Sequence, residues 1–442
     1  MYRKMLLNNI KELQLDNGLK AICLKKDGAP IVSIQLWYKT GSIHEHEGIR
    51  GISHVLEHMM FRGSAKYKPE EHANRINAVG GHSNAFTAED MTVYMNSVPC
   101  KSLEMVLEME ADRMDGLRLE RNLFETEQKV IIEEYHTYMN NPLTKSFLEF
   151  RQEFFRNHPY EVSPLGKLQD LQALTVEQCR NYYQQWYSPE NVILVIVGDF
   201  EEDNVFSMIQ EYFGNKRQSG GAGRVDLTHT VSMNMASRMS RRVEFDVPIL
   251  IVGYPAPPSS HEDAVPMEIM QQVLSGGESS RLHREIVRKQ SVAVMAGGIN
   301  HMLKLAGMSL FFAAFTPDIA VSRVEKAVLE QIKRIKTEGI TIAEMEKIKN
   351  STLTNRIFEL YNVDNICQKI GYSECIEGDY RLWVRRLDAL KSLDGSRLMD
   401  VAQAYWDDSK CHLLHLQPSK VNPLLFAGGI FRRIFSKLRR AN

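Results

Sequence analysis

The sequence predicts an α+β protein made of two similar halves. Its 442 residues, 43% of them apolar and 25% charged, are enough for two domains of about 200 residues each. Segments with strand spacing and segments with helical spacing alternate in the first half. A polar, glycine-rich stretch at 214–224 interrupts this pattern, which then begins again. We therefore expect domains at 1–214 and 229–418, joined by a linker at 215–228.

The expected elements follow from the spacing of apolar residues. Strands are predicted where short apolar runs are rich in β-branched residues, and helices where apolar residues recur every three or four positions. In chain order these are Ile31–Tyr38 (strand), Lys101–Met114 and Val176–Trp186 (helices), Val192–Val197 and Ile249–Gly253 (strands), Ala264–Leu274 (helix), Met308–Ala314 (strand), and Ala320–Lys336 and Ile342–Leu360 (helices). The second half therefore repeats the order of the first, without a clear repeat of individual residues.

A short segment of the first half, His54 to His58, carries the clearest chemical signal. In a helix, His54 and His58 lie about 40° apart, and Glu57 lies about 60° to the other side of His54. Two neutral imidazoles at this spacing can bind one Zn²⁺, and a glutamate that is not a ligand can take a proton from the metal-bound water. The order His-x-x-Glu-His is that of the inverzincin peptidases. The alternative is a pair of surface histidines on an amphipathic helix, so a third ligand is required.

The segment 123–135 has helical spacing and contains several carboxylates. Glu127 and Glu134 are seven residues apart, which is two helical turns, so they share one face. One of them could supply the third ligand. The alternative is an acidic face exposed to solvent, which is where most helical glutamates lie.

Together these segments resemble the pitrilysin and mitochondrial processing peptidase family of zinc metallopeptidases. In that family, about 76 residues separate His-x-x-Glu-His from a glutamate ligand in a segment of the type Val-[Ile/Val/Leu]-x-Glu-Glu. Here that segment is 130–134, and Glu134 stands 76 positions after His58. Further segments match the family in order along nearly the whole chain: 15–20, 36–42, 61–64, 80–87, 158–160 and 276–282.

The resemblance implies a fold and a role for individual residues. The fold would be two similar domains, each a mostly antiparallel sheet with helices packed on one face. One Zn²⁺ would be held by His54, His58 and Glu134, with Glu57 as the general base. Glu127 would support or orient the site without binding the metal. The implied activity is that of a zinc-dependent endopeptidase acting on short or unfolded peptides.

The segment Asn84-Ala85-Phe86 follows a glycine turn and reads as a strand. In the family the matching strand is an exposed edge, to which the substrate peptide adds as another strand. We therefore expect Asn84, Ala85 and Phe86 to contact the substrate. The alternative is an ordinary strand of the sheet.

The sequence departs from the family pattern in its second half. Family peptidases commonly supply an Arg and a Tyr there to hold the substrate and the oxyanion, but these positions fall on Val287 and Val294, and Arg288 is one place out of register. Losing one such donor typically costs about 100- to 1000-fold in rate. We therefore expect the metal-bearing subunit of a heterodimer, whose related, metal-free partner supplies the pair. Alternatives are a monomer or homodimer in which Arg281 or His283 replaces the pair, and a non-catalytic scaffold subunit of a larger complex.

Composition and the chain ends give weaker expectations. A net charge of −1 gives no case for nucleic acid binding. Six cysteines without paired spacing and an amino terminus with only three consecutive apolar residues favour a reducing, cytoplasmic location. The stretch 419–442 is predicted to form a basic amphipathic tail, which could contact an anionic membrane surface weakly or dock on its own domain or a partner.

Overall fold

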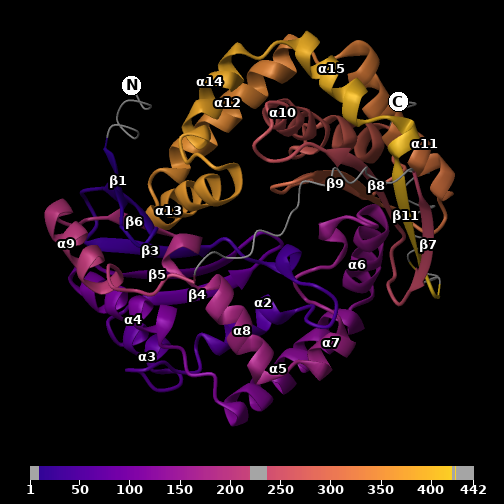
Figure 1. Ribbon diagram of the computed structural model, residues 1–442. Coiled ribbons are helices and arrows are strands. Elements are labelled where there is room, and N and C mark those ends of the chain that lie inside the picture. The colour runs from indigo at the N-terminus through magenta and orange to yellow at the C-terminus, as the bar shows by residue number, and fades with distance from the viewer. Residues whose placement is uncertain (1–8, 220–235, 421–423, 425–442) are drawn as a thin grey trace. The chain divides into compact units, whose positions relative to one another are not determined.

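The chain folds into two compact units, each built around one sheet (Figure 1). The computed structural model describes residues 9–219, 236–420 and 424. Within these, the first unit comprises 9–137, 162–219 and 355–385, and the second comprises 138–161, 236–354 and 386–420. Neither unit is continuous in sequence, because each takes one segment from the other half of the chain.

The sheet of the first unit has six strands in the order β1-β2-β6-β3-β5-β4, all antiparallel except the parallel pair β2 and β6. The strands are β1 (Ile10–Gln14), β2 (Lys20–Lys25), β3 (Ile31–Tyr38), β4 (His82–Thr87), β5 (Thr92–Pro99) and β6 (Val192–Gly198). Every residue of β6 is buried, as its uninterrupted apolar sequence requires for a strand covered on both faces. The hairpin of β5 and β4 leaves β4 at the edge of the sheet.

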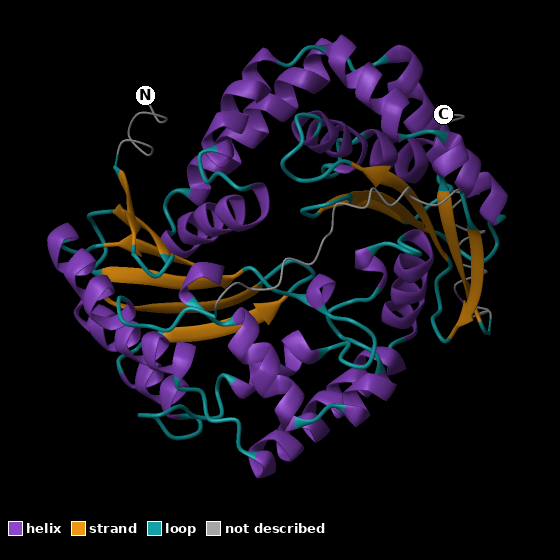
Figure 2. Ribbon diagram, viewed as in Figure 1, coloured by secondary structure: helices purple, strands orange, loops and turns teal. Residues whose placement is uncertain are grey.

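Helices from the first half of the chain cover one face of this sheet (Figure 2). They are α2 (Ile52–Met59), α3 (Glu71–Ala78), α4 (Leu103–Asp115), α5 (Arg121–Asn140), α7 (Leu168–Ala173), α8 (Val176–Trp186) and α9 (Glu202–Phe213). Their apolar sides meet alternate strand residues such as Ile34 and Leu36 in the larger core. This core fixes the helices α2 and α5, which carry the candidate metal ligands.

The opposite face of the sheet is covered by α13 (Val363–Tyr372), which comes from the second half of the chain (Figure 1). Its Ile366 and Ile370 pack against Trp37 and the outward side chains of β6. The approach is close at Gly371, where a Cβ atom would lie 2.1 Å from Trp37 Nε1. Glycine is therefore needed at this contact.

The sheet of the second unit has five strands in the order β7-β11-β8-β10-β9, with only β7 and β11 parallel. The strands are β7 (Arg238–Val243), β8 (Ile249–Ala256), β9 (Met295–Met302), β10 (Gly307–Ala314) and β11 (His412–Pro418). Its core is completed by helices α10 (Ala264–Ser275), α11 (Val321–Glu338), α12 (Ile342–Glu359), α14 (Leu382–Ser392) and α15 (Gly395–Tyr405).

The other face of this second sheet receives α6 (Pro142–Phe154), a helix from the first half of the chain. Phe150 lies against Gly253 of β8, and the ring of Phe154 lies 4.6 Å from that of His412. The segment after α6 is also anchored here, because the backbone N–H of Leu305 donates to the hydroxyl of the buried Tyr160.

The predicted fold class, two mostly antiparallel sheets packed with helices, is confirmed, and each predicted strand and helix is present with ends within a few residues. The expectation that helices pack on one face of each sheet is incomplete, because α13 and α6 each cover the other face of the sheet formed by the opposite half of the chain. The boundaries 1–214, 215–228, 229–418 and 419–442 stay a prediction, and residues 220–228 and nearly all of the tail after 420 lie outside the described part. No helix in that part is long and apolar enough to cross a bilayer.

Replacing Gly371 by Ala should destabilise the first unit by about 1–3 kcal/mol, because the new methyl group collides with the fully buried Trp37. The measurement is the unfolding transition of the first unit in urea. Gly395→Ala is the matched control, since a Cβ atom there meets nothing within 4 Å. Equal midpoints for the two variants would contradict this account of the α13 contact.

Candidate metal centre

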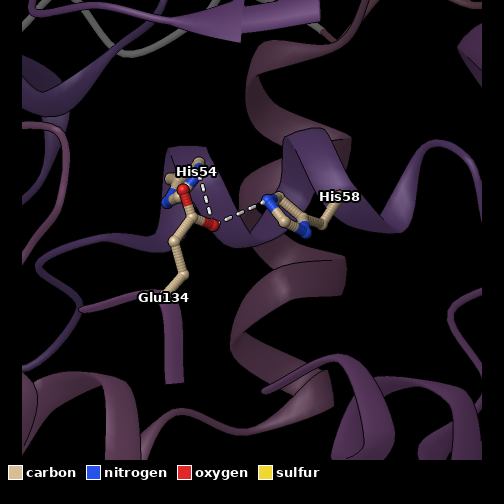
Figure 3. Close-up of side chains that lie close together, drawn as sticks. All are labelled: His54, His58 and Glu134. Atoms are coloured by element: carbon tan, nitrogen blue, oxygen red, sulfur yellow. Dashed lines mark ion pairs between the residues drawn. The ribbon is translucent and has the colours of Figure 1, made fainter. Parts of the chain in front are cut away.

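Two imidazoles and one carboxylate converge at the contact of α2 with α5 (Figure 3). The Nε2 atoms of His54 and His58 lie 3.8 and 3.6 Å from Oε2 of Glu134, and one ligand atom from each residue lies within 4.8 Å of the others. A tetrahedral zinc site with bonds of about 2.0–2.2 Å separates its ligand atoms by roughly 3.3–3.6 Å. The cluster is thus close to the size that such an ion needs, with two imidazole nitrogens and one carboxylate oxygen, a donor set typical of zinc.

Local sequence explains why α2 presents this face. Val55, Leu56 and Met59 are fully buried in the core, so the side of the helix that holds His54 and His58 is turned away from it. The two imidazole rings stand nearly perpendicular, at 88°, with centroids 4.8 Å apart. Both histidines remain partly accessible, with 15% and 23% of their side chains exposed.

The first turn of α2 is held by a buried carboxylate. Glu45 accepts hydrogen bonds from the backbone N–H groups of Gly51 and Ser53, at 2.7 and 2.9 Å. These are N–H groups that a helix leaves without a partner of its own. Burial raises the pKa of Glu45 to about 7, although these hydrogen bonds and the charge of Arg50 oppose the shift.

A second carboxylate fixes the ring of His58. Its Nδ1 lies 2.9 Å from Oε1 of Glu127, whose side chain is only 3% exposed. With the proton on Nδ1, the lone pair of Nε2 is free to face Glu134 and a metal. Burial would raise the pKa of Glu127, but the hydrogen bond to His58 and the pairing with Arg62 lower it below its usual value.

The two histidines differ electrostatically. Burial, reinforced by the charge of His58, lowers the pKa of His54 to about 4, so His54 is neutral at pH 7. Burial would also lower the pKa of His58, but its hydrogen bond to Glu127 and the charge of Glu57 raise it. The buried Nδ1 of His54 has no hydrogen-bond partner among the described residues.

Glu57 lies beside the cluster without belonging to it. Its Oε2 accepts a hydrogen bond of 2.6 Å from the hydroxyl of Thr87, the last residue of β4. Burial raises the pKa of Glu57, with a further contribution from Glu134, against the opposing effects of Thr87 and His58. A partly desolvated carboxylate held by one oxygen is suited to accepting a proton with the other.

The predicted substrate strand is the edge strand β4. Asn84 is exposed, and its side chain accepts a hydrogen bond from the backbone N–H of Ala85. Ala85 packs on the same core as α2, whereas Phe86 turns to the opposite face and meets Trp37 edge to face. Any contact of Phe86 with a peptide on the α2 side of β4 would therefore be through its backbone.

The second unit holds the positions where an oxyanion donor would be expected. Val287 lies in the π-helical segment His283–Lys289 and packs on the second core, and Val294 is 39% exposed. Arg288 forms a surface ion pair with Glu278.

The two alternative donors are already engaged. The buried guanidinium of Arg281 donates to both carboxylate oxygens of Glu344, at 2.8 and 2.7 Å, and to the carbonyl of Gly339. Nδ1 of His283 lies 2.8 Å from the carbonyl oxygen of Glu278. Arg281 thus has a structural role within its own unit.

Three residues in contact with the site or its helix were not predicted from the sequence: Glu45, Arg62 and Thr87. Arg62 follows His58 by four positions, a helical spacing that could have drawn attention to it. Nothing local marks Glu45 or Thr87, because their contacts depend on how distant segments pack.

The pH dependence of the free energy of unfolding should reveal the raised pKa of the buried Glu45. Because its folded pKa of about 7 exceeds the ordinary value of 4.5, the stability that protonated Glu45 contributes is complete below about pH 4.5 and is lost as the pH rises through 7. The amide side chain of the Glu45→Gln variant cannot ionise. The free energy of unfolding of Glu45→Gln, relative to that of the original chain, should therefore increase by up to about 3 kcal/mol when the pH is raised from 4.5 to 8. Urea unfolding at both pH values measures this.

Glu47→Gln, at a neighbouring exposed carboxylate, is the control for the Glu45 experiment. A difference between Glu45→Gln and the original chain that stays constant with pH would contradict the raised pKa.

Two family models and several known proteins match this chain. The family model described as "Insulinase (Peptidase family M16)" matches residues 21–166, and "Peptidase M16 inactive domain" matches 173–352. "Zinc protease PqqE" of Helicobacter pylori is 25% identical over 434 residues, which are 95% of each chain. The crystal structure of a protease from Helicobacter pylori is 26% identical and superimposes with a TM-score of 0.85, covering 92% of this chain and 99% of that one.

A larger relative has the same fold within a longer chain. The periplasmic protease PqqL from Escherichia coli, at 17% identity and a TM-score of 0.80, matches 96% of this chain but only 50% of its own. Both domain types of one peptidase family follow each other in this sequence, and the relatives match over nearly its full length. The chain therefore belongs to the M16 peptidase family, also known as the pitrilysin family.

Proposed function

We propose that this chain is a zinc-dependent endopeptidase whose metal is held by His54, His58 and Glu134. The observation that carries the proposal is the approach of one Glu134 oxygen to both imidazole Nε2 atoms, at 3.6 and 3.8 Å. The name of the relative PqqE, a zinc protease, supports the same choice of metal. A scaffold role is less well supported, because the motif and Glu134 are intact and their side chains converge.

The protein residues around this site have separate tasks. When bound, zinc polarises the substrate carbonyl and lowers the pKa of a water molecule. Glu57 accepts the proton of that water and later returns it to the leaving amine. Thr87 holds one oxygen of Glu57, and Glu127 keeps the Nε2 lone pair of His58 directed at the metal.

The edge strand β4 supports an extended peptide as the substrate. Its outer backbone groups can pair with a peptide of any sequence, as in β-strand addition. Thr87 at the end of β4 also binds Glu57, so a peptide aligned along Asn84 and Ala85 would be brought toward the general base. This favours short or unfolded peptides, because a folded substrate cannot offer a free extended segment.

The lack of an oxyanion donor at positions 287 and 294 favours a partner subunit. Val287 and Val294 carry no donor, and Arg281 is committed to Glu344. We infer that a related subunit without His-x-x-Glu-His supplies the missing Arg and Tyr, forming a heterodimer. The match to half of the PqqL chain supports pairing of two such folds. A homodimer that cleaves peptides unaided is the alternative.

The location of the protein stays a prediction. All six cysteines are free, and all except Cys100 are buried, which is compatible with the cytoplasmic location inferred from the sequence. Contact of the basic tail with a membrane surface likewise remains a prediction.

Glu57→Gln should keep stoichiometric zinc and lose turnover by about three orders of magnitude or more, because the amide cannot accept the proton. Zinc content by elemental analysis and cleavage of a peptide library, with and without a chelator, measure this. The control is Glu133→Gln, which alters an exposed carboxylate next to Glu134. Chelator-sensitive cleavage by Glu57→Gln at the original rate would remove Glu57 from the mechanism.

Adding the related metal-free subunit should raise peptide cleavage about 100-fold or more over the isolated chain, since it restores an oxyanion donor. The measurement is kcat for one library peptide at a fixed concentration of this chain and increasing partner. In the partner, replacing the Arg and Tyr at the family positions is the matched control. Full cleavage by this chain alone, unaffected by the partner, would contradict the heterodimer.

A further inference from the structure

Besides the imidazole of His58, Glu127 contacts the guanidinium of Arg62, the one arginine or lysine that any described contact places on this carboxylate. Arg62 lies just beyond α2, where its backbone N–H donates to the carbonyl of Met59 at 2.9 Å. Its Nε lies 2.5 Å from Oε2 of Glu127, and its Nη1 pairs with Glu70 at the start of α3. Glu127 therefore uses one oxygen for His58 and the other for Arg62.

This arrangement makes a chain of contacts from the surface to a candidate ligand. Arg62 is 31% exposed and Glu70 is 52% exposed, whereas Glu127 is 3% exposed. A buried carboxylate is costly unless a partner compensates its charge. Arg62 provides that compensation through an ion pair of its Nε with one oxygen of the carboxylate.

The local charges also fit a divalent cation. Glu57, Glu127 and Glu134 are three carboxylates in this region, and Arg62 divides its one positive charge between Glu127 and Glu70. An excess of negative charge therefore remains, which a divalent ion would reduce. Arg62 offsets the charge of Glu127, whose other oxygen faces His58 Nδ1.

We propose that Arg62 is a positioning residue that raises zinc affinity by acting through Glu127 on His58. The inference rests on the proposed zinc site. Arg62 does not touch the metal or the substrate in this account. Its effect is transmitted by the carboxylate that fixes the tautomer and the ring orientation of His58.

The test is the zinc dissociation constant of the full chain, measured by competition with a chromophoric chelator. Arg62→Met should weaken zinc binding about 10- to 100-fold, the usual effect of losing support for a metal ligand. Arg62→Lys keeps the positive charge without the planar guanidinium. Its zinc affinity should lie between those of the original chain and Arg62→Met. If Arg62→Met fails to fold by circular dichroism, Arg62→Gln takes its place.

A double-mutant cycle distinguishes action through Glu127 from a general loss of structure. In a Glu127→Gln background, Arg62→Met should have no further effect on zinc affinity. Additive losses would overturn the proposed route. Arg75→Met is the matched control, because Arg75 forms a surface ion pair with Glu71 on the neighbouring helix α3. The Arg75→Met variant should bind zinc as tightly as the original chain.

The zinc titration distinguishes failure of the role of Arg62 from failure of the zinc site itself. Zinc affinity of Arg62→Met within twofold of the original chain, or tighter, would overturn the role of Arg62 and leave the zinc site intact. An original chain that binds no zinc would overturn the proposed function itself, and this inference with it. The proposal is supported if Arg62→Met weakens zinc binding, Arg62→Lys weakens it less, and Arg62→Met has no additional effect when Glu127 is already replaced by Gln.

Discussion

The chemistry of this protein depends on how α5 packs against α2. One turn of α2 sets the spacing of His54 and His58, but a pair of imidazoles alone is a weak and unselective site. The third group, Glu134, is 76 residues further along the chain, and burial of the apolar sides of both helices in one core brings it within 4 Å of both Nε2 atoms. Contacts that stabilise this packing therefore also stabilise the site, although they lie outside it.

Each unit depends on one helix that the other half of the chain contributes. Each sheet is covered on one face by helices of its own half and on the other by a helix from the opposite half, α13 in the first unit and α6 in the second. A sheet with apolar side chains on both faces cannot remain exposed on one of them. Neither half of the chain is therefore a complete unit, and each half, if separated from the other, would lack a helix that the core of its sheet requires.

Local patterns predicted the elements well, because they arise from local periodicity. The helix Val176–Trp186 and the strand Ile31–Tyr38 match the structure to the residue. The relative directions of His54, Glu57 and His58 follow from helical geometry alone. The third ligand does not, since spacing left Glu127 and Glu134 equivalent, and only the family resemblance assigned different roles to them.

Contacts between distant segments were beyond sequence reasoning. Periodicity shows that a helix such as α13 or α6 has a face to bury, but not which sheet it covers. The same limit applies to Thr87 on Glu57, to Glu45 on the first turn of α2, and to Arg62 on Glu127. Each contact joins elements whose separation in sequence carries no signal of its own.

Anomalous diffraction at the zinc edge, from crystals of the purified chain, tests the central claim most directly. We expect one strong peak between the Nε2 atoms of His54 and His58 and the carboxylate of Glu134, at about 2.0–2.2 Å from each. The peak should be absent from crystals of His58→Ala. An ion elsewhere, or no peak when zinc is in excess, would contradict the account.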